Sequence, residues 1–393
     1  WHRAYHGHRP ERARTRSGCR PCARHQLCQA RRQSCSNERR SRTSEDLKII
    51  IDRQKDIPAN DRQWLVDYGT GQHPDATAAE AALRFARLND PGRDIAPYIE
   101  LLDALSNDVR NKIAAHLADI EITDPRHPPV DIIVQVLQDV IPGTYGFQGD
   151  ADNYDDMANA DLMSVIDRKR GLPVALALIY VHAARRCQIE ITGIDFPGHF
   201  LLRLQSGGAR QIIDPFHGGI TLESAELREL LKAFHGLDAE LQPSHYREAS
   251  DIAILLRLQN NIKVRALRQG ELALAARIID NSLLIAPDHD GLWHQLGALY
   301  ARLNEDEKAL HAFTQFVKLC KDPMHQARIS AVIDELRERL GHPVLITAKE
   351  PVDPQINNAP VQLYPIRSKN PDLDHAPNPV RDVTKPGPSK DPA

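Results

Sequence analysis

The chain has 393 residues, of which 41% are hydrophobic and 26% charged, so it can bury a substantial core and is expected to form two or more folded units. The formal net charge of −3 hides an asymmetry: residues 1–45 hold twelve Arg, no Lys and three Glu, a balance of +9, which leaves −12 for the rest. An acidic body argues against nucleic acid as a partner. No stretch reaches the roughly 18–20 apolar residues that a membrane span requires, and only Cys187 and Cys320 lie beyond residue 45, which suits a reducing cytoplasm.

The two ends of the chain have compositions that do not build a core. Residues 1–45 lack Val, Ile, Phe and Met, so we expect a disordered Arg/Cys-rich leader. A gene start placed too far upstream, so that non-coding sequence is translated, would also explain this composition. The leader holds a Cys-x-x-Cys pair and two further cysteines, namely Cys19, Cys22, Cys28 and Cys35. By spacing alone, the alternative to a disordered leader is that these four bind zinc. Ten of the 27 prolines fall in residues 351–393, and we expect a disordered Pro-rich tail over 343–393.

The body opens with a helical region. The word Thr77-Ala78-Ala79-Glu80 has the spacing of a capping box, and the apolar positions after it fit a helix to Leu88. Apolar periodicity predicts a second helix from Pro97 to Leu117 and a third from Val130 to Val140, the latter closed by Pro142-Gly143.

A polar loop and a central helix come next. The Asp- and Asn-rich segment 150–159 is predicted to be a loop, and a short helix fits residues 160–168. Pro173 suits the first turn of a helix, where its missing amide would be unpaired anyway. The run from Pro173 to Cys187 is apolar nearly all round, which predicts a buried, central helix.

Three short segments then have the composition of strands: Ile189–Ile194, Phe200–Leu204 and Gln211–Ile213. Ser206-Gly207-Gly208 is the turn word between the last two. Antiparallel pairing would bring His199, at the start of one strand, next to Asp214 at the end of its neighbour.

A helix, a strand with His and a strand with Asp is the order found in papain-like and transglutaminase-like thiol enzymes. In those enzymes a Cys at the helix N-terminus is held as thiolate by unpaired amides and the helix dipole. The His takes up its proton and the Asp fixes the imidazole tautomer. His199 and Asp214 are therefore the candidate catalytic residues, although His199 alone would be read as a buried histidine and Asp214 alone as a turn cap. The helix start, Pro173, offers no thiol.

From residue 250 the pattern changes to a repeat. The spacings of a tetratricopeptide unit are met by Trp293, Leu296, Gly297, Tyr300, Ala309 and Phe313. Thirty-four residues earlier, Ala275 and Ile279 match the last two, and Pro287 stands where such a unit ends. Because two units cannot bury their own faces, we expect them to pack on a helix over 325–340 or on the core domain.

Several words of the central segment resemble the SirB family, a bacterial group whose domain is similar to the transglutaminase core. These words are Arg168-Lys169-Arg170-Gly171-Leu172-Pro173, Ala183-Ala184-Arg185-Arg186, Phe196-Pro197-Gly198-His199-Phe200 and Asp214-Pro215-Phe216-His217-Gly218-Gly219. The similarity extends upstream through Ala82–Arg87 and Tyr98–Asp103, so it covers roughly residues 75–235.

The resemblance implies a fold more firmly than a reaction. By that alignment transglutaminases place their nucleophilic Cys near Pro173 or Val174, which the SirB family generally does not, and His199 and Asp214 would be the retained pair. An Arg-Asn-Ser-Tyr-Leu-like word typical of the family ahead of the helix is replaced here by residues 157–162, Met-Ala-Asn-Ala-Asp-Leu.

Two residues beside the predicted cleft are candidate binding residues. Arg170 belongs to the basic cluster Arg168-Lys169-Arg170, which would bind a carboxylate or phosphate, or would be only a solvated helix end. His217 would line the same cleft or be an exposed turn residue. A metal site built from His199, Asp214 and His217 is a further alternative, but no metal or cofactor is expected.

The remaining nucleophile candidates are weaker. Cys187 falls at the C-terminal end of its helix, where the dipole raises the pKa of a thiol, so it is interpreted as a buried structural cysteine. Cys320 is interpreted as packing within the repeats. Ser164 and Thr192 carry hydroxyls, but neither lies at the expected helix start.

These patterns predict an α+β protein with a helical N-terminal subdomain, a transglutaminase-like (papain-like) helix-plus-antiparallel-sheet core, and α-helical tetratricopeptide hairpins. The predicted division is a leader over 1–45, a SirB-type domain over 46–245, repeats over 250–342 and a tail over 343–393. The leading hypothesis is a cytoplasmic, non-catalytic module that binds a protein or peptide through the repeats, a pseudoenzyme with no nucleic-acid or membrane partner. The alternative is a hydrolase or acyl transferase that uses His199 and Asp214 with an unidentified nucleophile or activated water.

Overall fold

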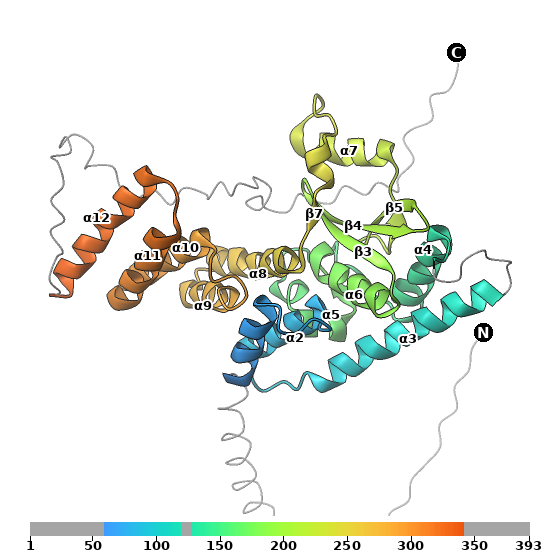
Figure 1. The fold of residues 1–393 in the computed structure, drawn as a ribbon, viewed down its shortest axis with the longest axis horizontal. Coiled ribbons are helices and arrows are strands. Elements are labelled where there is room, and N and C mark those ends of the chain that lie inside the picture. Colours follow the sequence, from blue (N-terminus) through green and yellow to red (C-terminus); the bar gives the residue numbers. More distant parts are fainter. Residues whose placement is uncertain (1–58, 119–126, 342–393) are drawn as a thin grey trace, which may run out of the picture. The chain divides into compact units, whose positions relative to one another are not determined.

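The helical region ahead of the sheet is built as its capping signals predict. In the computed structural model of the protein, which describes residues 59–118 and 127–341, residues 59–69 are helical and α2 spans Ala78–Asn89 (Figure 1). Thr77 is the N-cap of α2, and its side chain accepts a hydrogen bond from the Glu80 amide at 3.4 Å. α3 spans Ala96–Ala118 and α4 spans Val130–Gln138. The predicted bounds of these helices are confirmed to within two residues.

The end of α4 differs from the prediction that Pro142 closes it. The chain continues as a π-helical segment, η1, over Asp139–Thr144 with Pro142 inside it. Pro142 has no N–H to donate, and the hydrogen bonds around it widen: the Tyr145 amide donates to the Val140 carbonyl at 2.9 Å, and the Phe147 amide to the Ile141 carbonyl at 3.1 Å. The proline therefore widens the last turn instead of ending it.

A short parallel pairing leads into the central helix. β1 (Gln148–Gly149) pairs with β2 (Arg170–Gly171), and the 3-10 turn η2 (Met157–Asn159) and α5 (Leu162–Arg168) lie between them in the chain. α6 spans Pro173–Arg186 with Pro173 in its first turn, and every residue from Val174 to Ala184 is buried. The sequence prediction of a central helix is confirmed.

The sheet is antiparallel and has the order β6-β5-β4-β3-β7. Its strands are β3 (Glu190–Phe196), β4 (His199–Ser206), β5 (Ala209–Asp214), β6 (Ile220–Thr221) and β7 (Glu248–Ala249). β4 and β5 are joined by Gly207 and Gly208, whose φ angles of 58° and 83° fit a two-residue hairpin turn that favours glycine. The register Leu202↔Ile213 places His199 near the end of β5 that carries Asp214.

The two faces of the sheet belong to different apolar clusters. Phe200, Leu202 and Leu204 of β4 join the main core cluster together with α6. Leu201, which alternates with them, packs on the other face with Leu227 and Leu231 of α7 (Ser224–His235). This alternation is what a strand covered on both sides requires.

Up to residue 341, five helices are described after the sheet: α8 (Asp251–Arg268), α9 (Leu272–Ser282), α10 (Asp290–Arg302), α11 (Asp306–Leu319) and α12 (Pro323–Arg339). Gly297 of α10 is required by packing, because a Cβ there would lie 2.7 Å from the Phe313 ring of α11. These hairpins confirm the predicted repeats.

α8 belongs to the core as much as to the repeats. Its apolar face, with Ile254, Leu255 and Leu258, lies in the same buried cluster as α6. All described residues fall in one of the two compact units of the chain, residues 57–393. The α+β fold class is thus confirmed, and the domain limits near residues 245–250 stay a prediction.

Other expectations fall outside what the structure describes. The leader, with its Cys19 and Cys22 pair, and the tail over 343–393 both lie beyond the described residues. Within the described part of the chain, no helix is long and apolar enough to cross a membrane.

Candidate functional site

The N-terminus of α6 presents apolar side chains at the position where thiol enzymes of this order keep a cysteine. Leu172 is the N-cap, its amide donates to the Asn159 carbonyl at 2.9 Å, and Pro173 begins the helix. Val174 and Ala175 follow and are buried. The helix dipole therefore points at a turn with no ionisable group of its own.

His199 is placed at the start of β4, as predicted, and is half-buried. Its backbone carbonyl accepts a hydrogen bond from Arg257 of α8 at 3.4 Å. Burial lowers the pKa of the imidazole, the charge of Asp214 opposes that shift, and His217 adds to it. His199 is thus mainly neutral, and its imidazole interacts electrostatically with both Asp214 and His217.

The carboxylate of Asp214 is committed to its own loop. It is 3% exposed; Oδ1 accepts from the Phe216 amide at 2.8 Å, and Oδ2 lies 2.7 Å from His217 Nδ1. The structure shows no hydrogen bond from the His199 ring to Asp214 among the described residues, and the carboxylate accepts one from His217 instead. The physical reason is local: Asp before Pro folds back on the amide two residues later, which turns the carboxylate toward residues 216 and 217.

His217 is an exposed turn residue that is also an ordered one. Its side chain is 39% exposed and its ring lies edge-on to Phe216, with centroids 5.2 Å apart. The hydrogen bond to Asp214 raises the pKa of His217, and burial opposes that shift. Because an ionised carboxylate only accepts, His217 donates through Nδ1, which leaves Nε2 able to accept a proton.

Two tyrosines near Asp214 were not singled out in the sequence. The Tyr180 hydroxyl of α6 is buried and has no hydrogen-bond partner among the described residues, and burial together with the charge of Asp214 raises its pKa. A Cβ at Gly219 would lie 3.1 Å from that hydroxyl, so the glycine allows the turn to approach α6. Tyr154 packs against Phe216, with centroids 5.8 Å apart. In the sequence, the glycine pair 218–219 was the one sign that this turn comes close to another element.

The basic cluster divides into separate roles. Arg168 is bound to the polar loop, with ion pairs to Asp150 at 3.0 Å and Asp156 at 2.9 Å. Lys169 lies over the Phe147 ring at 4.3 Å. Arg170 is exposed and donates to nearby backbone carbonyls, whereas the exposed Arg168 is held by its ion pairs.

The other nucleophile candidates lie in structural settings. Cys187 caps the C-terminus of α6, its thiol donates to the Ser106 carbonyl at 3.3 Å, and burial raises its pKa. Cys320 is buried in the cluster between α11 and α12. Ser164 Oγ accepts from Arg93 at 3.4 Å, and the Thr192 hydroxyl is buried without a partner among the described residues.

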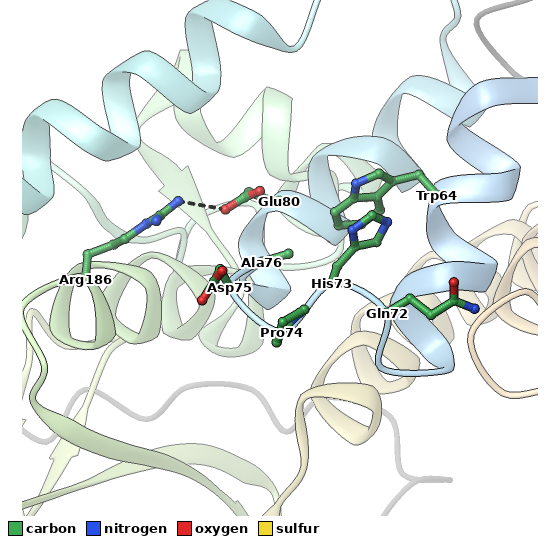
Figure 2. A pocket seen from close by; sticks show the side chains of 8 residues that line it. All are labelled: Trp64, Gln72, His73, Pro74, Asp75, Ala76, Glu80 and Arg186. Carbon is green, nitrogen blue, oxygen red and sulfur yellow. Dashed lines mark hydrogen bonds and ion pairs between the residues drawn. The ribbon is translucent and has the colours of Figure 1, made fainter.

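Two surface cavities lie apart from these histidines. One of about 460 Å³ is lined by residues of the N-terminal helices and by Arg186 (Figure 2). The other, of about 350 Å³, lies between β5, β6 and α7. Neither lining includes His199, Asp214 or His217. Across residues 59–118 and 127–341, no three His, Cys, Asp or Glu side chains are grouped so as to hold a metal ion.

Family models match most of the described chain in two pieces. The model of the transglutaminase-like superfamily matches residues 96–260, and a tetratricopeptide repeat model matches residues 262–340. The two matches meet within α8, the helix that is shared by the core and the repeats.

Curated relatives match over the same region. A UPF0162 protein of Vibrio cholerae is 31% identical over 181 residues, which are 46% of this chain and 67% of that protein. A UPF0162 protein of Pseudomonas aeruginosa is 35% identical over 185 residues, 45% of this chain and 65% of that protein. Protein SirB1 of Salmonella typhimurium is 26% identical over 179 residues, 45% of this chain and 66% of that protein. The chain spans 63% to 65% of the length of the first curated relatives that it matches.

Proposed function

The chain belongs to the SirB (UPF0162) family of transglutaminase-like proteins with tetratricopeptide repeats, and on that premise we propose that it is a non-catalytic module that binds a protein or peptide. The observation that carries the proposal is the first turn of α6. Its residues from Pro173 to Leu176 are Pro, Val, Ala and Leu, so the helix dipole has no thiol to hold as thiolate.

The arrangement of Asp214 supports the same proposal. An orienting carboxylate serves a triad when it binds the imidazole that faces the nucleophile. Here the two oxygens bind the Phe216 amide and His217, while His199 makes its hydrogen bond through its backbone carbonyl. The carboxylate then stabilises the turn that follows β5.

The repeats supply the binding surface in this proposal. Tetratricopeptide repeats in general mediate contacts between proteins. In this chain Lys263 of α8 donates a hydrogen bond to Gln295 of α10 at 2.5 Å, which joins the two helices. The acidic balance of the chain beyond residue 45 disfavours nucleic acid as the partner. The unpaired thiols of Cys187 and Cys320 suit a cytoplasmic site of action.

A displayed library of random peptides, selected on the full chain, tests this proposal. We expect selected peptides to bind with a measurable Kd and to lose affinity about tenfold or more in Lys263→Ala, since removing a charged hydrogen-bonding group from a binding face costs about 1.5–3 kcal/mol. Lys318→Ala is the matched control, because Lys318 is an exposed lysine of α11. Equal affinity in both variants would place the binding site elsewhere. Failure to select any binding peptide would refute the proposal.

One observation favours a second candidate function, hydrolysis or acyl transfer. The Asp214–His217 pair is a base with its orienter, and the half-exposed imidazole can take a proton from water. This candidate predicts hydrolysis of a peptide thioester that disappears in His217→Ala and survives in His235→Ala, a control at an exposed histidine of α7. Equal rates in the two variants would reject it.

A further inference from the structure

Two histidines meet where the last described helix packs on the rest of the repeats. α12 lies beside α11 (Figure 1), and His325 in the first turn of α12 contacts His294 of α10. The centroids of the two imidazoles are 5.0 Å apart, and the planes of the rings are inclined by 63°. Both side chains are half-buried. The two rings therefore form part of the interface that joins α12 to α10.

The other neighbours of this pair are the aromatic rings of α11. The centroid of the His294 ring lies 5.1 Å from that of Phe316 and 6.0 Å from that of Phe313. The His325 ring lies 4.9 Å from Phe316 in the same measure. Both phenylalanines are buried. An imidazolium in this place would exchange part of its hydration for apolar contacts, which is unfavourable for a charged group.

The charges around His294 disfavour its protonation as well. Burial lowers the pKa of His294 to about 4, His325 and Arg328 of α12 add to this shift, and Asp290 of α10 opposes it. α11 faces the imidazole with its two phenylalanine rings. The first turn of α12 carries the positive partial charge of a helix N-terminus, although Asp322 caps it. His294 is therefore held in its neutral form as long as α12 is docked.

The rest of the interface holds α12 mainly through apolar and uncharged contacts. Three buried residues of α12 share an apolar cluster with α11, namely Ile329, Ile333 and Leu336. Gln326 donates to two backbone carbonyls at the end of α11, at 3.1 and 2.6 Å. An ion pair from Arg339 to Asp306, at 3.3 Å, joins the far end of α12 to α11, and a pair this exposed contributes little. These contacts keep α12 docked while the histidine pair is neutral.

We propose that the contact between His294 and His325 makes the docking of α12 sensitive to pH, so that acidification releases α12 from α10 and α11. Once α12 is released, the His294 imidazole is hydrated and takes up a proton from water with the ordinary pKa of histidine, near 6.5. Between about pH 6.5 and pH 4 only the released form binds this proton, so release becomes more favourable as the pH falls. Release uncovers the apolar side of α11, including the buried Phe316.

Hydrogen exchange of the full chain at pH 7.5 and pH 5, read by mass spectrometry on peptides of α12, measures this release. Each exchange rate is divided by the rate of an unprotected amide at the same pH, which gives a protection factor. We expect the protection factor of α12 to fall about 30-fold at pH 5, as the pKa values of the docked and released forms require. In His294→Phe, which keeps an aromatic ring but cannot titrate, the fall should be about threefold or less. His311→Phe, at an exposed histidine of α11, is the matched control and should behave as the wild type does.

Peptides of α6 serve as the internal reference for unfolding of the whole domain. His294→Phe should leave their protection as it is in the wild type at both pH values, because the change acts on α12 alone. His294→Gln is a second variant that cannot titrate, without the bulk of a phenyl ring, and should also remove the response of α12. A fall of less than about threefold in the wild type, or an equal fall in the wild type and both His294 variants, would overturn the proposal. A response that His311→Phe removes as fully as His294→Phe would overturn it too.

Discussion

Thr77 joins two distant helices through one buried hydroxyl. Its Oγ1 accepts from the Glu80 amide at the start of α2 and lies 2.8 Å from Nδ1 of His182 in α6. Thr77 is 7% exposed and His182 is fully buried. The Nε2 atom of His182 lies 3.7 Å from Asp103 Oδ1 and has no hydrogen-bond partner among the described residues, so Thr77 makes the one hydrogen bond of that ring there.

Thr77→Ala should therefore remove two effects at once. Loss of an N-cap costs about 1 kcal/mol, and leaving a buried imidazole nitrogen without a partner costs about 1–3 kcal/mol. Together we expect a loss of about 2–4 kcal/mol in the free energy of unfolding, out of the roughly 5–15 kcal/mol that domains have.

Urea unfolding followed by far-UV circular dichroism measures this loss, with Thr77→Ser as the matched variant that keeps the hydroxyl. We expect the serine variant to lie within about 1 kcal/mol of wild type, since Ser is as good an N-cap as Thr. The reasoning is refuted if Thr77→Ala unfolds within about 0.5 kcal/mol of wild type, or if Thr77→Ser loses as much as Thr77→Ala.

Three further predictions concern buried polar groups. Burial lowers the pKa of His182 to about 4, whereas the same imidazole in the unfolded chain has a pKa near 6.5, so between these pH values only the unfolded chain binds the proton. The free energy of unfolding should therefore fall by about 3 kcal/mol as the pH drops from about 6.5 to about 4. The urea midpoint of His182→Gln should lack this dependence on pH. Arg265→Met should cost about 1–3 kcal/mol and speed amide hydrogen exchange in the loop of Tyr154, whose carbonyl accepts from Arg265 at 2.9 Å; unchanged exchange would contradict it. Asp214→Asn should lower the pKa of His217 in an NMR titration, because the charged hydrogen bond that raises it is lost, and an unmoved pKa would show that the bond does not form in solution.

Elements whose ends carry local signals could be predicted from the sequence. The Thr77 N-cap starts α2, Pro173 starts α6, and the Gly207-Gly208 pair joins β4 to β5. The repeats were recognisable because Ala309 and Phe313 have counterparts in Ala275 and Ile279 at a fixed spacing, and the structure shows why the second unit also carries Gly297, which lies against the Phe313 ring.

Features set by long-range packing were missed. The π-helical segment around Pro142 depends on which carbonyls its neighbours can reach, which periodicity does not encode. α8 has an apolar face like any repeat helix, and only the three-dimensional structure shows that this face joins the core cluster of α6. A domain limit read from the change in pattern near residue 250 therefore falls in front of a helix that both parts share.

The places of His199 and Asp214 in the sheet were predictable from the sequence, but their hydrogen bonds were not. Strand order brings His199 and Asp214 to one end of the sheet, as antiparallel pairing requires. The partner of Asp214 is decided by a turn of three residues, in which the carboxylate binds the Phe216 amide and His217. A hydrogen bond between residues three apart costs little chain entropy, so it competes well with a bond between strands. The sequence prediction considered only the pairing of the strands.

The fate of a bound peptide tests the central claim most directly. A peptide selected for binding would be incubated with the full chain and with the His199→Ala/His217→Ala double variant, then recovered and weighed by mass spectrometry. Our account predicts that both proteins bind the peptide and return it unchanged. A peptide that is cleaved, or joined to an added amine, by the wild-type chain and not by the double variant would contradict it.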